Sequence, residues 1–215
     1  MKIMNSLQQK AFDAEKLAYW FLRLNGFFTI TNFVVHPDEG HQQRTDVDIL
    51  GCRFPYRKEL LTKPMEDYDI FQSIDNKILI VLAEVKSGRC NLNGPWTLPI
   101  KKNMQRVLFS VGCFQTTNIE EIASHMYDQG FYKNDTYIIE HICFGSEKNY
   151  DLLTRYENVP QITWDMVLEF IHNRFEKYRQ QKSGHPQWDE YGKMLWEKSL
   201  NCDQLAFTNS VLNIS

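Results

Sequence analysis

One stretch most constrains how this chain can fold: residues 78–88, with the sequence ILIVLAEVKSG. Its first six residues are apolar and mostly branched, a run that is long enough for one buried strand and too short to span a membrane. Glu84 and Lys86 end the run, and side chains two residues apart in a strand point to the same face of a sheet. Charges at the end of a buried strand cost free energy, so we expect this pair to have a partner or a function.

Composition sets the class of protein. The chain has 215 residues, of which 43% are hydrophobic and 13% aromatic, enough for one substantial domain with a packed core. Its net charge is −3. A protein with this charge has no overall positive field to hold nucleic acid, so any such binding must come from local basic patches.

The cysteines and the N-terminal residues suggest a compartment. The five cysteines are scattered and include no C-x-x-C pair, so we expect reduced thiols rather than disulfides or a zinc ribbon. Residues 1–9 contain no apolar stretch typical of a signal peptide. We therefore expect a cytoplasmic protein with no membrane segment.

Hydrophobic periodicity and turn residues predict the order of elements. A helix at 6–24 ends at Asn25 and Gly26, and an irregular insertion at 53–76 precedes the central strand. The predicted strands cover 27–35, 46–52, 77–85 and 136–144, and the predicted helices after the first cover 101–111, 119–128, a segment starting at 163, and 187–200. This order predicts an α/β fold with helices packed on the faces of a sheet. We divide the chain into a domain at 1–150, a C-terminal helical extension at 151–205 and a flexible tail at 206–215.

Three acidic residues and one lysine form the candidate site. Glu15 lies on the first helix, Asp48 on the second strand, and Glu84 and Lys86 at the end of the central strand. Adjacent strands are about 5 Å apart, so Asp48 and Glu84 can converge. Two close carboxylates repel each other, which either raises the proton affinity of one of them or calls for a cation between them. Together with the carbonyl of Val85, their oxygens suit Mg²⁺ or Mn²⁺.

Such a site would suit phosphodiester hydrolysis. A bound ion would polarise a phosphoryl oxygen and supply hydroxide at neutral pH. Lys86 would orient or deprotonate the attacking water, or neutralise charge that develops on the phosphate. Glu15 would reach the same ion directly or through water. Asp46 shares a strand face with Asp48, but we favour Asp48 because apolar residues follow it directly.

At four segments the chain resembles the PD-(D/E)XK nuclease superfamily, in style nearest to its resolvase-like and restriction-endonuclease-like branches: Glu15-x-x-Ala18, Asn25-Gly26-Phe27, Asp46 to Leu50, and Ala83 to Ser87. The resemblance covers about residues 6–144. It implies a restriction-endonuclease-like α-β-β-β-α-β core with a mixed central sheet, which cuts DNA with Mg²⁺. The insertion at 53–76 departs from the pattern, because related chains often have a short hairpin there.

The resemblance also implies roles for individual residues. It carries the helix glutamate onto Glu15, the metal-binding aspartate onto Asp48, and the E-x-K pair onto Glu84 and Lys86. Some members of the superfamily have a glutamine on the helix after this pair, which corresponds to Gln105 here.

Each of these residues also has a structural interpretation. Glu84 and Lys86 would form a solvated ion pair at a strand end, a contact that contributes little to stability. Glu15 would be part of an exposed helix face. For DNA contacts we consider Lys101, Lys102, Gln105 and Arg106, with Arg53, Arg57 and Lys58 as a second group; a solvated surface is the alternative for both groups. Trp96 and Tyr56 either stack on bases or pack in the core and loops.

The sequence therefore predicts a Mg²⁺-dependent endonuclease that hydrolyses DNA phosphodiester bonds. Its specificity would come from the insertion, the C-terminal helices or a partner protein, and a homodimer would allow cuts on both strands. One alternative is a catalytically silent subunit with a nuclease fold that binds DNA or acts as a scaffold. A second alternative is a nuclease directed at RNA, which presents the same phosphodiester.

Overall fold

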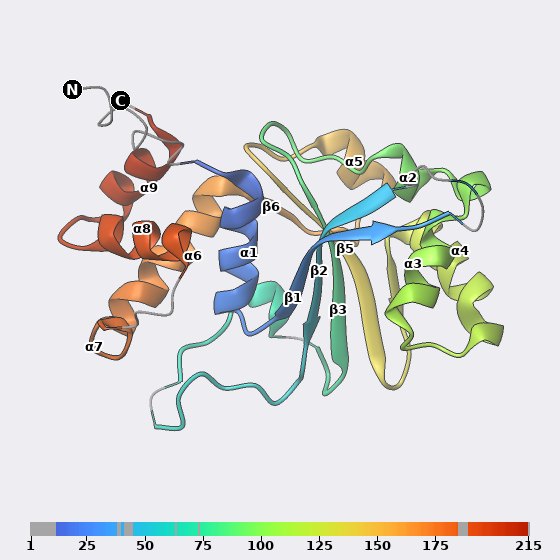
Figure 1. Cartoon of the computed structure of the whole chain (residues 1–215), viewed down its shortest axis with the longest axis horizontal. Helices are drawn as coiled ribbons and strands as arrows, with labels where there is room; N and C mark the ends of the chain where they lie inside the picture. The colour runs from blue at the N-terminus through green and yellow to red at the C-terminus, as the bar shows by residue number, and fades with distance from the viewer. Residues whose placement is uncertain are drawn as a thin grey trace.

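The computed structural model describes residues 12–37, 40, 45–62, 64–72, 74–184 and 189–214. These residues form a mixed β-sheet with helices on both faces (Figure 1). The strands are β1 (Phe28–Val35), β2 (Thr45–Arg53), β3 (Ile78–Val85), β4 (Phe131–Lys133), β5 (Tyr137–Gly145) and β6 (Gln161–Thr163). Within this part of the chain the sheet order is β1-β2-β3-β5-β4, and β6 also pairs with β5.

The strand directions make the sheet mixed. β1, β2 and β3 are antiparallel neighbours, whereas β5 is parallel to β3 and β6 is parallel to β5. A parallel pair needs a crossover connection, and here α2, α3 and α4 lie in the segment between β3 and β5. The predicted α/β class with a mixed central sheet is thus confirmed.

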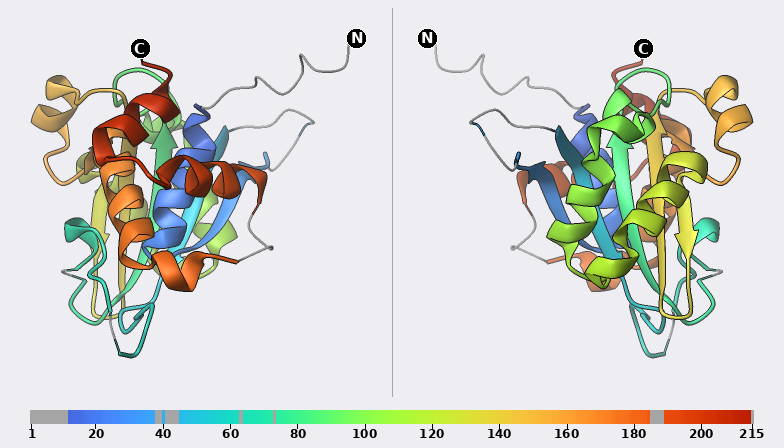
Figure 2. Two further views of the ribbon diagram at one scale, coloured as in Figure 1. Left: turned by 90° about the vertical axis from the view of Figure 1, so that its left-hand side faces the viewer. Right: turned by 90° about the vertical axis from the view of Figure 1, so that its right-hand side faces the viewer.

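Two groups of helices cover the two faces of the sheet (Figure 2). On one face lie α1 (Ala14–Leu24), α6 (Trp164–Lys177), α7 (Arg179–Lys182), α8 (Glu190–Ser199) and α9 (Gln204–Leu212). On the other lie α2 (Gly94–Thr97), α3 (Asn103–Val111), α4 (Ile119–Gln129) and α5 (Tyr150–Arg155). Short 3₁₀ turns occur at Asp69–Phe71, Pro99–Lys101 and Thr116–Asn118.

The first helix is shorter than the periodicity suggested. Asp13 is its N-cap, because its side chain accepts a hydrogen bond from the amide of Lys16, and α1 therefore begins at Ala14 rather than at residue 6. Residues 6–11 of the predicted helix lie outside the described residues. The helix ends as predicted, at Asn25 and at Gly26 with φ +81°.

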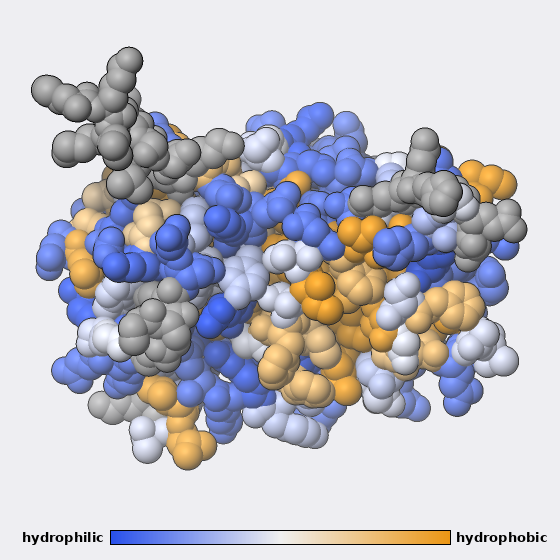
Figure 3. Space-filling model, viewed as in Figure 1, coloured by the Kyte–Doolittle hydropathy of each residue, from blue (hydrophilic) through white to orange (hydrophobic). Residues whose placement is uncertain are grey.

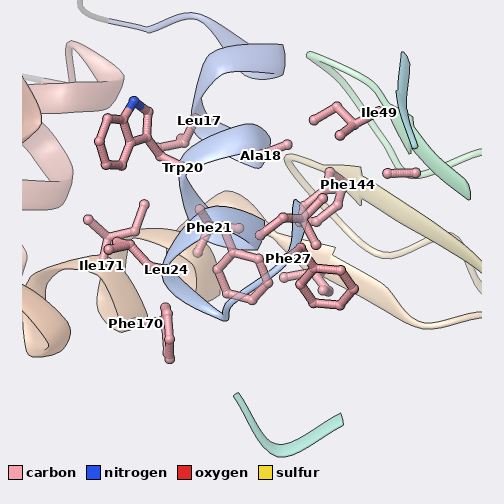
Figure 4. Close-up of a cluster of buried hydrophobic side chains, with 14 of the residues drawn as sticks. Leu17, Ala18, Trp20, Phe21, Leu24, Phe27, Ile49, Phe144, Phe170 and Ile171 are labelled. Carbon is pink, nitrogen blue, oxygen red and sulfur yellow. The ribbon is translucent and has the colours of Figure 1, made fainter. Parts of the chain in front are cut away.

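An aromatic cluster joins α1 to the sheet and to α6 (Figure 4). The Phe21 ring lies 5.7 Å from Phe144 on β5 and 5.2 Å from Phe170 on α6, both in edge-on geometry. Edge-on aromatic pairs contribute about 0.5–1.5 kcal/mol beyond the area that they bury. The cluster fixes α1 across the sheet, and with it the position of Glu15.

The predicted boundary at residue 150 does not separate two cores. Val167, Phe175 and Leu195 belong to the same hydrophobic cluster as Leu17 and Phe21 of α1. β6, which lies beyond residue 150, also adds a strand to the sheet. The C-terminal helices therefore complete the layer that α1 begins.

Residues 206–212 of the predicted flexible tail belong to a helix, α9, which ends at Leu212. Phe207 and Val211, one helical turn apart, are fully buried in the cluster that contains α1 and α6. Asp203 caps this helix through the amide of Ala206. The prediction was wrong because apolar burial of one face holds this segment in place.

The insertion at 53–76 is largely irregular, as predicted, and ion pairs attach it to α6. Asp67 accepts hydrogen bonds from Arg53, Arg57 and Arg174, and Arg174 is fully buried. Glu59 joins the same network through Arg174 and Lys182. These bonds occupy Arg53 and Arg57, which therefore form ion pairs inside the protein and not the solvated surface considered as the alternative to DNA contacts.

Two further observations concern the expected compartment and partners. None of the helices in the described ranges combines the length and apolar composition that a membrane crossing requires. All five cysteines are free thiols. Exposed apolar side chains gather over β1 (Figure 3), among them Phe28, which is 69% exposed, and Ile30, which is 55% exposed. Such patches often mark interaction sites, but the homodimer stays a prediction.

Candidate active site

The candidate site lies where β2 and β3 separate. Their pairing runs from Arg53 opposite Leu79 to Ile49 opposite Ala83 and stops there. The next pair in this register would be Asp48 and Glu84. In its place, Oδ2 of Asp48 accepts a hydrogen bond of 2.7 Å from the amide of Val85. A side-chain carboxylate thus replaces the main chain as acceptor.

The neighbouring strand is distorted at the same level. β1 pairs with β2 on both sides of Asp48, but the pair that Asn32 would form with Asp48 is missing, and Asn32 has φ +51°. This left-handed conformation suits asparagine better than most residues. Beyond this point β1 and β2 bend towards α3 (Figure 1). The regular pairing of β2 is therefore interrupted at Asp48 on both of its sides.

Sheet geometry places the key side chains on one face. Residues opposite each other in an antiparallel pair project to the same side, as do residues two apart in one strand. Asp48, Glu84 and Lys86 therefore share a face. It is the face covered by α2, because Glu84 contacts Trp96 of that helix.

Glu84 is held by two donors. It is only 2% exposed; its Oε1 lies 2.5 Å from Nζ of Lys86, and its Oε2 accepts a hydrogen bond of 2.7 Å from Nε1 of Trp96. Trp96 is itself buried and packs near the ring of His141. Burial excludes base stacking by Trp96 in this arrangement. Tyr56 is exposed, so its prediction stays untested.

The electrostatics show that the three acids interact. Burial raises the pKa of Glu84, and the charge of Asp48 adds to this, whereas hydrogen bonds from Lys86 and Trp96 oppose it. The pKa of Asp48 is also raised, chiefly by burial, although the amide of Val85 and the charge of Lys86 lower it. Glu15 has a raised pKa through partial burial and the nearby charges of Asp48, Asp13 and Asp46. The structure therefore brings Asp48, Glu84 and Lys86 together, whereas Glu15, on α1 at the other face of the sheet, is linked to this group within the described residues only through the charge of Asp48.

Asp46 and Asp48 differ in their contacts. Asp46 lies opposite Val34 of β1 and affects the site only through its charge. Asp48 alone of the two contacts the end of β3. The geometry favours the choice of Asp48.

The fit of a metal ion depends on which oxygens are available. The described residues contain no group of three or more His, Cys, Asp or Glu side chains that could hold a metal. Oδ1 of Asp48 accepts no hydrogen bond from them. In an extended residue the N–H and C=O point to the same edge, so the carbonyl of Val85 faces Asp48. Oδ1 of Asp48 and the carbonyl oxygen of Val85 fit Mg²⁺, which keeps several waters and needs only one or two carboxylates. Glu84 would have to release Lys86 or Trp96 before it could bind the same ion.

The candidate DNA-binding residues divide into two kinds. Lys101 and Lys102 are exposed in the turn before α3. Arg106 donates to the carbonyls of both lysines and thereby holds this turn. Gln105 donates to Glu120 of α4 and makes no contact with the carboxylates of the site. Only the two lysines present free charge to solvent in the manner that a phosphate contact needs.

Sequence reasoning considered Trp96 only for base stacking or packing and missed its hydrogen bond to Glu84. No spacing links it to Glu84, because the loop of residues 87–93 and the start of α2 fold back to place the indole on the carboxylate. The available signal was chemical: a buried glutamate needs donors, and a tryptophan in the following loop has one.

Comparison with protein-family models, with curated proteins and with solved structures found no match to this chain. The residues and their geometry are therefore the basis for its functional assignment.

Proposed function

We propose that this protein is a metal-dependent deoxyribonuclease of the PD-(D/E)XK type. The observation that carries the proposal is the convergence of Asp48, the Val85 main chain, Glu84 and Lys86 where β2 and β3 separate. The strand order adds support. The resemblance implies the order α-β-β-β-α-β, and the chain has a helix, three antiparallel strands, crossover helices and a strand parallel to β3, with the short β4 as an additional strand before β5.

The residues would divide the work as follows. Asp48 and the carbonyl of Val85 would hold Mg²⁺ or Mn²⁺, which supplies Lewis acidity and lowers the pKa of a bound water. Lys86 holds a positive charge beside the carboxylates, where it can orient the attacking water and offset charge on the phosphate. Trp96 fixes the orientation of Glu84, and Glu15 adds negative charge next to Asp48.

One observation favours the alternative of a catalytically silent subunit. Both oxygens of Glu84 are engaged, by Lys86 and by Trp96, so the pair is satisfied as a structural ion pair. A nuclease directed at RNA would use the same residues as one directed at DNA. A substrate panel separates these candidates.

The test uses supercoiled plasmid, single-stranded DNA, branched DNA and RNA, each with Mg²⁺, Mn²⁺ or EDTA. We expect metal-dependent cleavage of DNA, and a loss of about a hundredfold or more in Lys86→Ala, the usual contribution of a proton-transfer group. Lys177→Ala, an exposed lysine on α6, is the matched control and should cut normally. DNA binding without cleavage under any metal would favour the silent subunit, and cleavage of RNA alone would favour the RNA nuclease.

A further inference from the structure

A second hollow lies at the edge of the sheet, away from the candidate active site. It has a volume of about 200 Å³ and is formed by β3, β4, β5 and the segment around the 3₁₀ turn Asp69–Phe71. The residues that line it are Ile70, Ile74, Leu79, Phe131, Lys133, Ile138 and Glu140. The cavity is therefore apolar except for one acid and one lysine.

Glu140 is the unusual member of this lining. Its side chain shares a face of β5 with Ile138 and Ile142, so it projects to the side of the sheet opposite Glu84. It is 9% exposed, and within the described ranges it makes no hydrogen bond and no ion pair. Lys133, the cation at the rim, pairs instead with Asp75.

Burying the carboxyl group of Glu140 in an apolar cavity costs free energy. Removing it from water without a partner is unfavourable by several kcal/mol at most sites, and buried polar groups in folded proteins nearly always have a partner. The apolar neighbours Ile74, Leu79 and Ile138 offer none. Since none of the described residues supplies this partner, a donor that enters the cavity from outside would supply it.

We propose that this cavity binds the ammonium group of a short aliphatic amine, with Glu140 as its counter-ion. A volume of about 200 Å³ equals that of roughly seven liquid water molecules, which suits an alkyl chain of about four to six carbons. Apolar walls around one charged group are typical of sites that select a ligand by shape and by a single polar contact. A free amine and a lysine side chain share this chemistry.

The test is a binding titration with n-pentylammonium, followed by the NMR shifts of the isoleucine and leucine methyl groups. Burial raises the pKa of Glu140 to about 8, so the titration is carried out at pH 9. At this pH the carboxylate is charged, and an amine of pKa about 10.4 stays protonated. n-Pentanol has the same shape without the charge. N-acetyl-lysine amide distinguishes a side-chain ligand from a free amine.

We expect NMR shifts at Ile138 and Leu79 with n-pentylammonium. n-Pentanol should bind about tenfold or more weakly, because it lacks the charge-assisted hydrogen bond that the amine makes. Glu140→Gln should weaken amine binding by a similar factor, whereas Glu157→Gln, an exposed glutamate, should not. If Glu140→Gln fails to fold, Ile70→Trp at the rim should block binding sterically. Equal binding of alcohol and amine, or no effect of either variant, would overturn the proposal. The readout is independent of nuclease activity.

Discussion

At the scale of single residues, the contact between Trp96 and Glu84 gives the sharpest prediction about the site. Trp96→Phe keeps the ring but removes the only indole donor to Oε2 of Glu84. A hydrogen bond to a charged group contributes about 1.5–3 kcal/mol, so we expect cleavage slower by about tenfold or more because Glu84 loses its fixed orientation. Mn²⁺ binding should not weaken, because Oε2 of Glu84 becomes free to join the ion. Steady-state kinetics and Mn²⁺ titration by electron paramagnetic resonance measure both.

The control for this change is Trp196→Phe, which alters a tryptophan that packs against Phe175 on the opposite helix layer. It should leave the rate and the metal affinity unchanged. An unchanged rate in Trp96→Phe would show that the indole only fills space.

Glu140 also predicts a pH dependence of stability. Burial raises its pKa from 4.5 to about 8, so the folded state holds more protons than the unfolded state between these values. Stability therefore falls as pH rises through this window, by up to roughly 5 kcal/mol. Glu140→Gln should remove this fall, and urea unfolding of both proteins at pH 5, 7 and 9 measures it. An identical pH profile in the variant would contradict the assignment.

His141, the residue after Glu140, has the opposite effect on the pH dependence of stability. Burial lowers its pKa from 6.5 to about 4, so the unfolded state binds more protons between these values and stability rises with pH across them. The comparison with Glu140→Gln is therefore cleanest above pH 7, where His141 no longer titrates in either state.

At the scale of elements, the attachment of the insertion to α6 depends on Arg174. Arg174→Ala removes a fully buried guanidinium from Glu59 and Asp67 and leaves both acids with fewer partners. Breaking a buried ion pair costs about 3–5 kcal/mol, and we expect the lower end because Arg53 and Lys182 remain. Urea unfolding gives the cost.

The same variant should also expose residues 54–62 to proteases, because their anchor to α6 is weakened. Arg179→Ala, an exposed arginine on α7, is the matched control and should change neither stability nor proteolysis. Normal protease resistance in Arg174→Ala would show that the remaining ion pairs hold the insertion alone.

The longer elements could be predicted from the sequence, and the shorter ones could not. The apolar run of β3 and the glycine that ends α4 determine those elements locally. β4 and β6 have three residues each, too few for any period, and exist because β5 offers an edge to pair with. α9 had local signals in Asp203, Phe207 and Val211, but its burial against α6 is a tertiary contact.

The candidate site could also be predicted from the sequence only in part. The E-x-K spacing and the strand pattern predicted that Glu84 and Lys86 share a face, because a strand has a fixed period of two. The sequence could not predict that Lys86 and Trp96 would occupy both oxygens of Glu84, since that depends on the path of the loop and α2.

At the scale of the whole molecule, a net charge of −3 means that the proposed DNA binding would depend on a few local cations. If Lys101 and Lys102 contact phosphates, Lys101→Ala and Lys102→Ala should each make the slope of log K for DNA against log salt concentration less steep by about 0.9. Binding measured by fluorescence anisotropy from 50 to 200 mM salt gives the slopes. Lys177→Ala should leave the slope unchanged, and equal slopes in all variants would move the DNA surface elsewhere.

The path of β2 and β3 has a consequence for protein engineering. β2 runs away from Asp48 and β3 returns to Glu84, so the connection between them lies at the far end of the sheet from the site. Its length can change without altering which residues face each other across the two strands. Leu61, 95% exposed, and Thr62 mark a place in this connection where a foreign domain could be grafted without moving Asp48 or Glu84.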